Sequence, residues 1–172
     1  MSILETYYEP QDGAIDKADG VNREVRGLAR LVQVSPTQTL VDLTIRGVAP
    51  GTYRATIREY GDLGDGATST GPVWASSSTA SERGLLGTMQ VGKDGRGSTF
   101  INHPFQVWEV IGHAMVLSQQ DERSGPLRND ADTLAGIIAR SAGIWENDKM
   151  VCSCSGKTLW DERQDEVKKG ML

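Results

Sequence analysis

Cysteine and histidine are scarce in this sequence of 172 residues, which contains only two of each. The cysteines are Cys152 and Cys154, with one residue between them, so a framework of disulfides is excluded and a reducing compartment is expected. The histidines, His103 and His113, are too few to supply the several imidazoles of a redox copper centre.

Long apolar runs and basic clusters are lacking as well. No stretch approaches the roughly 18 consecutive apolar residues that span a membrane, and no apolar segment follows a basic one as in a secretory signal. The formal net charge is −5, the pI is about 5.0, and lysines and arginines form no stripe. Neither membranes nor nucleic acids are therefore expected as partners.

What the sequence does have is glycine, with 20 residues that separate short runs of β-branched and apolar side chains. Such runs, punctuated by turn signals, are typical of an antiparallel β-sandwich or flattened barrel, which we predict over residues 1–140. The polar segments Asp62–Arg83 and Ser118–Asp132 are expected to be long loops. The predicted strands are Val25–Val34, Thr39–Ile45, Tyr53–Tyr60, Leu86–Val91 and Val110–Leu117.

The sequence changes character beyond residue 143. We assign residues 1–143 to the β-domain and residues 144–172 to a C-terminal tail. Within the tail, Leu159–Lys169 has its acidic residues early and its lysines late, which suits the dipole of a short helix.

The tail carries the motif Cys152-Ser153-Cys154. A disulfide closed over so short a span is strained, and strained disulfides are oxidising and labile. In an extended segment both sulfurs point to one side, where two thiolates suffice for a linear or trigonal Cu(I) site. A tetrahedral Zn(II) site would need two more ligands, from His103, His113 or carboxylates. By spacing alone, these are equally well incidental cysteines.

The motif lies in a segment that closely resembles the C-terminal end of copper chaperones for Cu,Zn superoxide dismutase, and the fungal branch of that family in particular. The resemblance extends over essentially the whole chain, but it is most specific at the C-terminal end. It is carried by residues 136–143, Trp145–Asn147, Val151–Thr158, Trp160–Arg163, Val25–Arg30, Arg58–Asp62 and Ser69–Pro72.

The resemblance implies a Greek-key β-barrel of the Cu,Zn superoxide dismutase type, followed by a mobile tail. The family's first domain, a small copper-binding module with an M-x-C-x-x-C loop, has no counterpart in this sequence. The cysteines of the dismutase disulfide correspond to Ala67 and Ala135. The positions of dismutase metal ligands correspond to Thr56, Arg58, Val73 and Ser118.

We therefore expect no copper–zinc catalytic site in the barrel and no dismutase activity. Arg58 would instead place a fixed positive charge in the emptied site. The family implies a different role: docking on immature Cu,Zn superoxide dismutase as a heterodimer, with a homodimer when alone. The docked chaperone would deliver Cu(I), bound transiently by Cys152 and Cys154, and form the target's disulfide in the cytoplasm or the mitochondrial intermembrane space.

The residues that the resemblance places at the docking interface come from two segments. Arg140 is equally compatible with a solvated strand end, and Tyr60 with simple core packing. Trp145 and Trp160 flank the cysteine pair and would anchor the tail on the partner or cover the body. The interface residues are Tyr60, Gly61, Asp62, Arg140, Ser141, Ala142, Gly143 and Trp145.

Two other functional classes remain open at this point. A general thiol-disulfide oxidoreductase would turn over unrelated disulfides, although the motif lacks the helix N-terminus that usually activates such cysteines. A metal-free, dismutase-like binding module would keep its function after removal of the tail.

Overall fold

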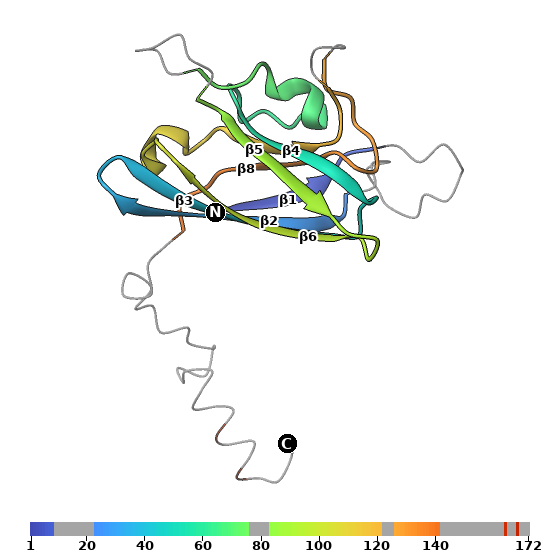
Figure 1. Cartoon of the computed structure of the whole chain (residues 1–172), viewed down its shortest axis with the longest axis horizontal. Helices are drawn as coiled ribbons and strands as arrows, with labels where there is room; N and C mark the ends of the chain where they lie inside the picture. The colour runs from blue at the N-terminus through green and yellow to red at the C-terminus, as the bar shows by residue number, and fades with distance from the viewer. Residues whose placement is uncertain (9–22, 76–82, 122–125, 142–163, 165–167, 169–172) are drawn as a thin grey trace. The chain divides into compact units, whose positions relative to one another are not determined.

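A computed structural model describes residues 1–8, 23–75, 83–121 and 126–141, together with Gln164 and Lys168 (Figure 1). The chain divides into two units, Met1–Arg140 and Ser141–Leu172, and each is described by itself. In the second unit Gln164 and Lys168 are helical and exposed, and the rest of the helix predicted over residues 159–169 lies outside the described residues.

The first unit is built from antiparallel strands, as predicted. Two short 3-10 helices, η1 (Gly66–Thr70) and η2 (Val107–Val110), lie in its connections, and no helix within the described ranges is long and apolar enough to cross a membrane. The strands are β1 (Ser2–Thr6), β2 (Val25–Ser35), β3 (Gln38–Arg46), β4 (Gly51–Arg58), β5 (Leu85–Val91), β6 (Arg96–His103), β7 (Ala114–Ser118) and β8 (Leu134–Ile137).

The eight strands form one sheet in the order β5-β4-β7-β8-β1-β2-β3-β6, and every neighbouring pair is antiparallel. The two strands at the ends of this order, β5 and β6, follow each other in the chain through a tight turn at Gly92–Gly95. The sheet therefore curls into a nearly closed barrel (Figure 1). This confirms the predicted all-β fold of the superoxide dismutase type.

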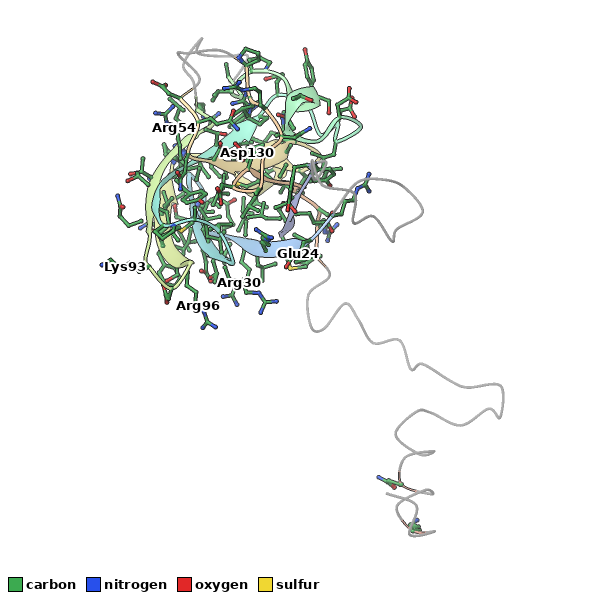
Figure 2. All side chains as sticks on the ribbon, turned by 90° about the vertical axis from the view of Figure 1, so that its right-hand side faces the viewer. Glu24, Arg30, Arg54, Lys93, Arg96 and Asp130 are labelled. Atoms are coloured by element: carbon green, nitrogen blue, oxygen red, sulfur yellow. The ribbon has the colours of Figure 1, made fainter. Side chains whose placement is uncertain are left out.

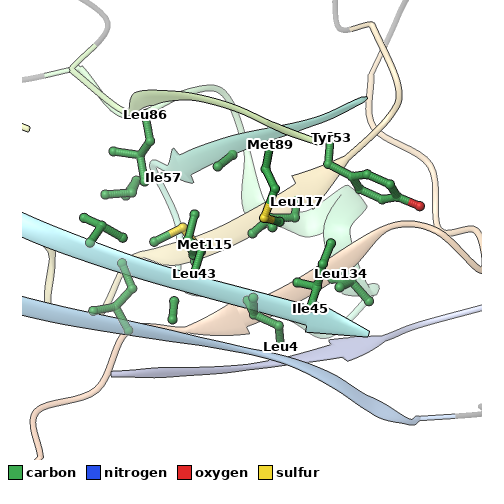
Figure 3. Packing of buried hydrophobic residues seen from close by; sticks show 14 of the residues in the cluster. Leu4, Leu43, Ile45, Tyr53, Ile57, Leu86, Met89, Met115, Leu117 and Leu134 are labelled. Atoms are coloured by element: carbon green, nitrogen blue, oxygen red, sulfur yellow. The ribbon is translucent and has the colours of Figure 1, made fainter. Parts of the chain in front are cut away.

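The barrel interior is filled by the inward-facing residues of its strands (Figure 3). Because side chains alternate along a strand, β3 sends Val41, Leu43 and Ile45 inward, and all three are fully buried. Each such side chain stabilises the fold by about 1.5–3 kcal/mol. The opposite wall contributes Ile57, Met115 and Leu117 among others.

A second layer covers the outside of β7 and β8. Every residue of β7 is buried, so this strand is covered on both faces. Its outer face meets a small apolar cluster that brings a loop residue, Ala67, together with Val116, Leu127 and Ala135. The long loops predicted by the sequence thus pack on the barrel, in the parts that the structure describes.

The five strands predicted from the sequence leave out β1, β6 and β8, and the run predicted for β7 starts too early. β6 (RGSTFINH) has no fully buried residue, so it lacks the apolar alternation of a half-buried strand. β8 has only four residues, too few to display a period. The run predicted from Val110 begins as η2, and Gly112, with a φ of 90°, separates it from β7.

Tyr53 provides a test of the packing at one end of the barrel. Its hydroxyl donates to the carbonyl oxygen of Ala49 at 2.9 Å and lies 3.3 Å from a carboxylate oxygen of Asp132. Burial, followed by the negative charge of Asp132, raises the pKa of Tyr53 from 10.0 to about 12. The neutral phenol is therefore favoured more strongly in the folded than in the unfolded chain.

We expect the free energy of unfolding to include a contribution from Tyr53 that is complete below pH 10 and is lost as the pH rises toward 12. Tyr53→Phe should remove this part of the pH dependence, as measured by urea denaturation across that window. Tyr60→Phe, which removes an exposed phenol, should retain it. An identical alkaline profile for Tyr53→Phe and the wild type would contradict the assignment.

Candidate functional site

The residues predicted to carry the chemistry lie outside the described part of the chain. These are Cys152 and Cys154, together with Ala142, Gly143 and Trp145 of the predicted interface. Their roles stay predictions, and the described residues define the body that would present them.

The four positions that correspond to dismutase metal ligands gather on the outer side of β4 and β7. In these two strands Ile57 pairs with Met115 and faces the core, so Thr56 and Arg58 face away from it. Ser118 pairs with Arg54 and lies on the same outer side. Val73 forms an isolated antiparallel bridge with Arg58. The structure thus places Thr56, Arg58 and Ser118 on one side of the barrel wall, with Val73 beside Arg58.

Three of these side chains make hydrogen bonds within the protein. The Thr56 hydroxyl donates to the carbonyl oxygen of Val116 at 3.4 Å, and the hydroxyls of Ser118 and Thr133 are hydrogen bonded at 3.0 Å. Arg58 is only 5% exposed, and both its Nε, at 3.0 Å, and its Nη2 donate to the carbonyl oxygen of Gly71.

A pocket of about 270 Å³ lies beside the Arg58 side chain. Its walls come from β4, from the loop after it and from the segment before β8. They are Arg58, Ala67, Thr68, Gly71, Pro72, Pro126 and Leu127.

The residues present do not fit the resident copper and zinc ions of a dismutase. Hydroxyl and aliphatic side chains replace imidazoles, and a guanidinium is a permanent cation with no lone pair to offer a metal. Within the described ranges, no group of three His, Cys, Asp or Glu side chains is placed to hold a metal ion.

The two histidines of the sequence make other contacts. His113 donates from Nδ1 to the carbonyl oxygen of Arg58 at 2.9 Å and packs against Trp74. His103 lies by Phe105 with Nε2 3.0 Å from the carbonyl oxygen of Leu85, and burial lowers the pKa of its ring.

The positions of the missing dismutase disulfide meet in the outer apolar cluster. Ala67 in η1 and Ala135 in β8 are both buried and belong to the same cluster with Val116 and Leu127. Loop and barrel are joined here by apolar packing, with no sulfur in either position.

The segment Tyr60–Asp62, assigned to the interface by the resemblance, directly follows β4. Tyr60 is 56% exposed, so the alternative interpretation of this residue as part of the core is wrong. Its backbone N–H donates to the carbonyl oxygen of Thr70 at 3.0 Å. The carboxylate of Asp62 accepts a hydrogen bond from the N–H of Gly64 at 2.8 Å, so this side chain shapes the loop.

Exposed apolar side chains lie on segments that adjoin the Tyr60 segment, and sequence reasoning missed them. Ile3, Ile111 and Ile137 are between 41% and 49% exposed. The register of β1 and β8 sets Ile3 opposite Ile137, and the N–H of Gly112, next to Ile111, donates to the carbonyl oxygen of Ile138 at 2.9 Å. We call Ile3, Tyr60, Ile111 and Ile137 the apolar face. An isoleucine on the outward side of β1, between buried Ser2 and Leu4, was the available signal.

Gly61 and Gly112 join the Tyr60 segment to the rest of this face. A Cβ atom on Gly61 would lie 1.9 Å from the carbonyl oxygen of Gly112, so only glycine permits this approach. Arg140 is exposed at the end of the first unit, where the N–H of Ala139 donates to the carbonyl oxygen of Met1 at 2.9 Å. Ser141 is exposed and belongs to the second unit.

Gly61→Ala should therefore destabilise the barrel, because the two backbones must separate to accommodate the methyl group. We expect the free energy of unfolding to fall by about 1–3 kcal/mol, as measured by urea denaturation. Gly64→Ala is the control, since its Cβ would meet only a side-chain oxygen of Asp62 at 3.2 Å. Equal stability of the two variants would show that the approach of Gly61 to Gly112 is not required.

The family of the barrel is established by sequence comparison. Residues 25–140 match the family model of copper/zinc superoxide dismutase. The match covers β2 to β8, including the outer layer that holds the substituted ligand positions.

Curated relatives then narrow the assignment. The superoxide dismutase 1 copper chaperone of Saccharomyces cerevisiae is 41% identical over 169 residues, which cover 96% of this chain and 65% of that protein. Its counterpart in Debaryomyces hansenii is 37% identical, over 99% of this chain and 68% of that protein. The human copper chaperone for superoxide dismutase is 36% identical, over 81% of this chain and 57% of that protein.

The chain belongs to the copper/zinc superoxide dismutase family, and within it to the copper chaperones for superoxide dismutase. It spans about two thirds or less of the length of these three relatives.

Proposed function

We propose that this chain is the docking body and reactive tail of a metallochaperone that activates immature Cu,Zn superoxide dismutase. The observation that carries the proposal is the combination, in one dismutase-type barrel, of ligand positions that cannot hold metal with an exposed apolar face beside them. A body of this kind suits recognition of a partner better than redox catalysis.

The apolar face supports docking by the properties of its side chains. Ile3, Tyr60, Ile111 and Ile137 come from four different segments and leave much of their surface in water. Burying them against a partner releases that surface from solvent, and a tyrosine among aliphatic side chains is typical of an interface centre. Arg140 follows the same edge and would add a polar contact at the rim. The same face would pair two copies of this chain when the target is absent.

The tail would perform the chemistry in two forms. In the reduced form the thiolates of Cys152 and Cys154 bind Cu(I) as cargo, which passes to the target by ligand exchange. In the oxidised form, a target thiolate attacks one sulfur of the strained Cys152–Cys154 disulfide and displaces the other as thiolate. The second target thiolate then attacks the mixed disulfide, so the target loses two electrons and the tail gains them.

Each cycle of disulfide transfer leaves the tail reduced. Further cycles require an external oxidant, such as molecular oxygen, that restores the disulfide. Docking raises the effective concentration of the tail cysteines near the target, which favours transfer to this partner over other thiols in a reducing cytoplasm.

The proposal is tested by mixing the chain with reduced, copper-free Cu,Zn superoxide dismutase and following the mass of the complex by light scattering. We expect a one-to-one complex, and formation of the target's disulfide when the chain is supplied with its cysteines oxidised. Failure to form a complex at micromolar concentrations would remove the partner assignment. Equal turnover of an unrelated disulfide substrate would favour a general oxidoreductase.

A further inference from the structure

Two of the substituted ligand positions, Arg58 and Val73, lie where the end of β4 meets the end of the loop that follows it. Arg58 ends β4, and Val73 follows the loop that contains η1. In the dismutase pattern, metal ligands at these two positions would tie the strand to the loop. Here the junction is made by the β-bridge between Arg58 and Val73 and by the guanidinium, which donates twice to the carbonyl oxygen of Gly71.

The contacts of Gly71 lead directly to the apolar face. Gly71 has a φ of 74°, and a Cβ atom there would lie 2.4 Å from the ring of Tyr60. The ring therefore packs against the residue whose carbonyl oxygen Arg58 holds. The backbone around it is paired as well, since Glu59 and Tyr60 donate to the carbonyl oxygens of Pro72 and Thr70.

We propose that Arg58 is a positioning residue that takes the place of a metal ion, holding the loop at Gly71 so that Tyr60 is presented for docking. The inference rests on the docking role proposed above for the apolar face. The residue that stands in place of a metal ligand would thus support docking on the partner.

The chemistry of arginine suits this role. A guanidinium offers several N–H donors in one plane, so two of them can share one carbonyl oxygen, and it remains charged at every physiological pH. Hydrogen bonds from a charged donor are stronger than neutral ones. Unlike a metal-held loop, a loop held in this way is indifferent to chelators and to the supply of metal.

The test compares Arg58→Met and Arg58→Lys with Arg54→Met, a matched control on the same strand whose side chain is half-buried and pairs with Asp121. Amide hydrogen exchange of residues 60–73 is measured in the chain alone, and thermal unfolding by circular dichroism reports whether each variant folds. Formation of the target's disulfide is then followed as a function of target concentration, with and without a chelator.

We expect Arg58→Met to speed amide exchange in residues 60–73 and to raise the half-saturating target concentration on the order of ten-fold. The rate at saturation should stay unchanged, because the tail cysteines are intact. Arg58→Lys, which keeps one charged donor, should recover part of the loss, and Arg54→Met should match the wild type. The chelator should affect none of the four proteins.

Three outcomes would overturn the inference. These are unchanged exchange in Arg58→Met, faster exchange with unchanged docking, or loss of wild-type docking in the chelator. Should Arg58→Met fail to fold, the comparison of Arg58→Lys with the wild type decides by the same measurements. Absence of docking by the wild type would refute the proposed function, whereas the exchange data would still report separately on the contact of Arg58 with the loop.

Discussion

Replacing both Cys152 and Cys154 with serine should abolish formation of the target's disulfide while leaving the complex with the target intact. A serine hydroxyl neither binds Cu(I) as a thiolate does nor takes part in thiol–disulfide exchange. We expect the rate of target oxidation to fall by at least about two orders of magnitude. The measurement is the fraction of disulfide-bonded target over time, read by trapping free thiols.

The single variants Cys152→Ser and Cys154→Ser test the disulfide-bonded form of the tail separately from its reduced form. Each retains one sulfur, so neither can form the internal disulfide that accepts two electrons. The control is Ser153→Ala, which changes the residue between the cysteines and should retain activity. Full maturation of the target by the double variant would contradict the proposed mechanism and favour a metal-free binding module.

A charge placed on the apolar face should prevent docking. Ile137→Asp puts a carboxylate at the end of β8, on the face that the partner would cover. Burial of an unpaired charge costs about 2–5 kcal/mol of binding free energy, which weakens the complex by at least roughly 30-fold. Isothermal titration with reduced, copper-free target measures the change.

Phe100→Asp is the matched control for that experiment. Phe100 is 69% exposed on β6 and is not part of the apolar face, so its replacement should leave docking unchanged. Both variants alter exposed side chains and should keep the stability of the wild type within about 0.5 kcal/mol. Equal affinities of Ile137→Asp and Phe100→Asp would show that the partner does not cover the apolar face.

Local sequence patterns predicted most of the barrel. β3, with buried Val41, Leu43 and Ile45 alternating with outward residues, shows the period of a half-buried strand. β6 shows no such signal, because none of its side chains is fully buried and its place is fixed by pairing along the length of β3. Pairing between distant strands is a tertiary property that local pattern does not record.

The candidate site, too, was predicted from the sequence only in part. The resemblance identified the substituted positions Thr56, Arg58, Val73 and Ser118, and the structure gathers them on one side of the barrel wall. The resemblance could not show that Tyr60 is exposed, because a single aromatic residue at the end of a strand does not indicate whether its side chain points to the core or to solvent. The apolar face draws one residue from each of four segments, and only the folded chain reveals such a set.

Charged side chains are unevenly distributed over the surface of the barrel. Although the chain carries a net charge of −5, arginines and Lys93 project from one side of the barrel, where Arg30, Lys93 and Arg96 are labelled (Figure 2). Arg46 and Arg96 face each other across β3 and β6, a like-charge pairing that disfavours the ladder locally. Arg30, farther along the same sheet, is paired with Asp42 of β3 at 2.6 Å.

The outer apolar cluster has a consequence for the order of events in the cell. Ala67, Val116, Leu127 and Ala135 close the loop against the barrel without a covalent link, so this body reaches its native state with no oxidising step. A protein that forms a disulfide in its target could not act if its own folding first required a disulfide. Under the proposed function, the body would thus fold without the oxidant that the tail requires.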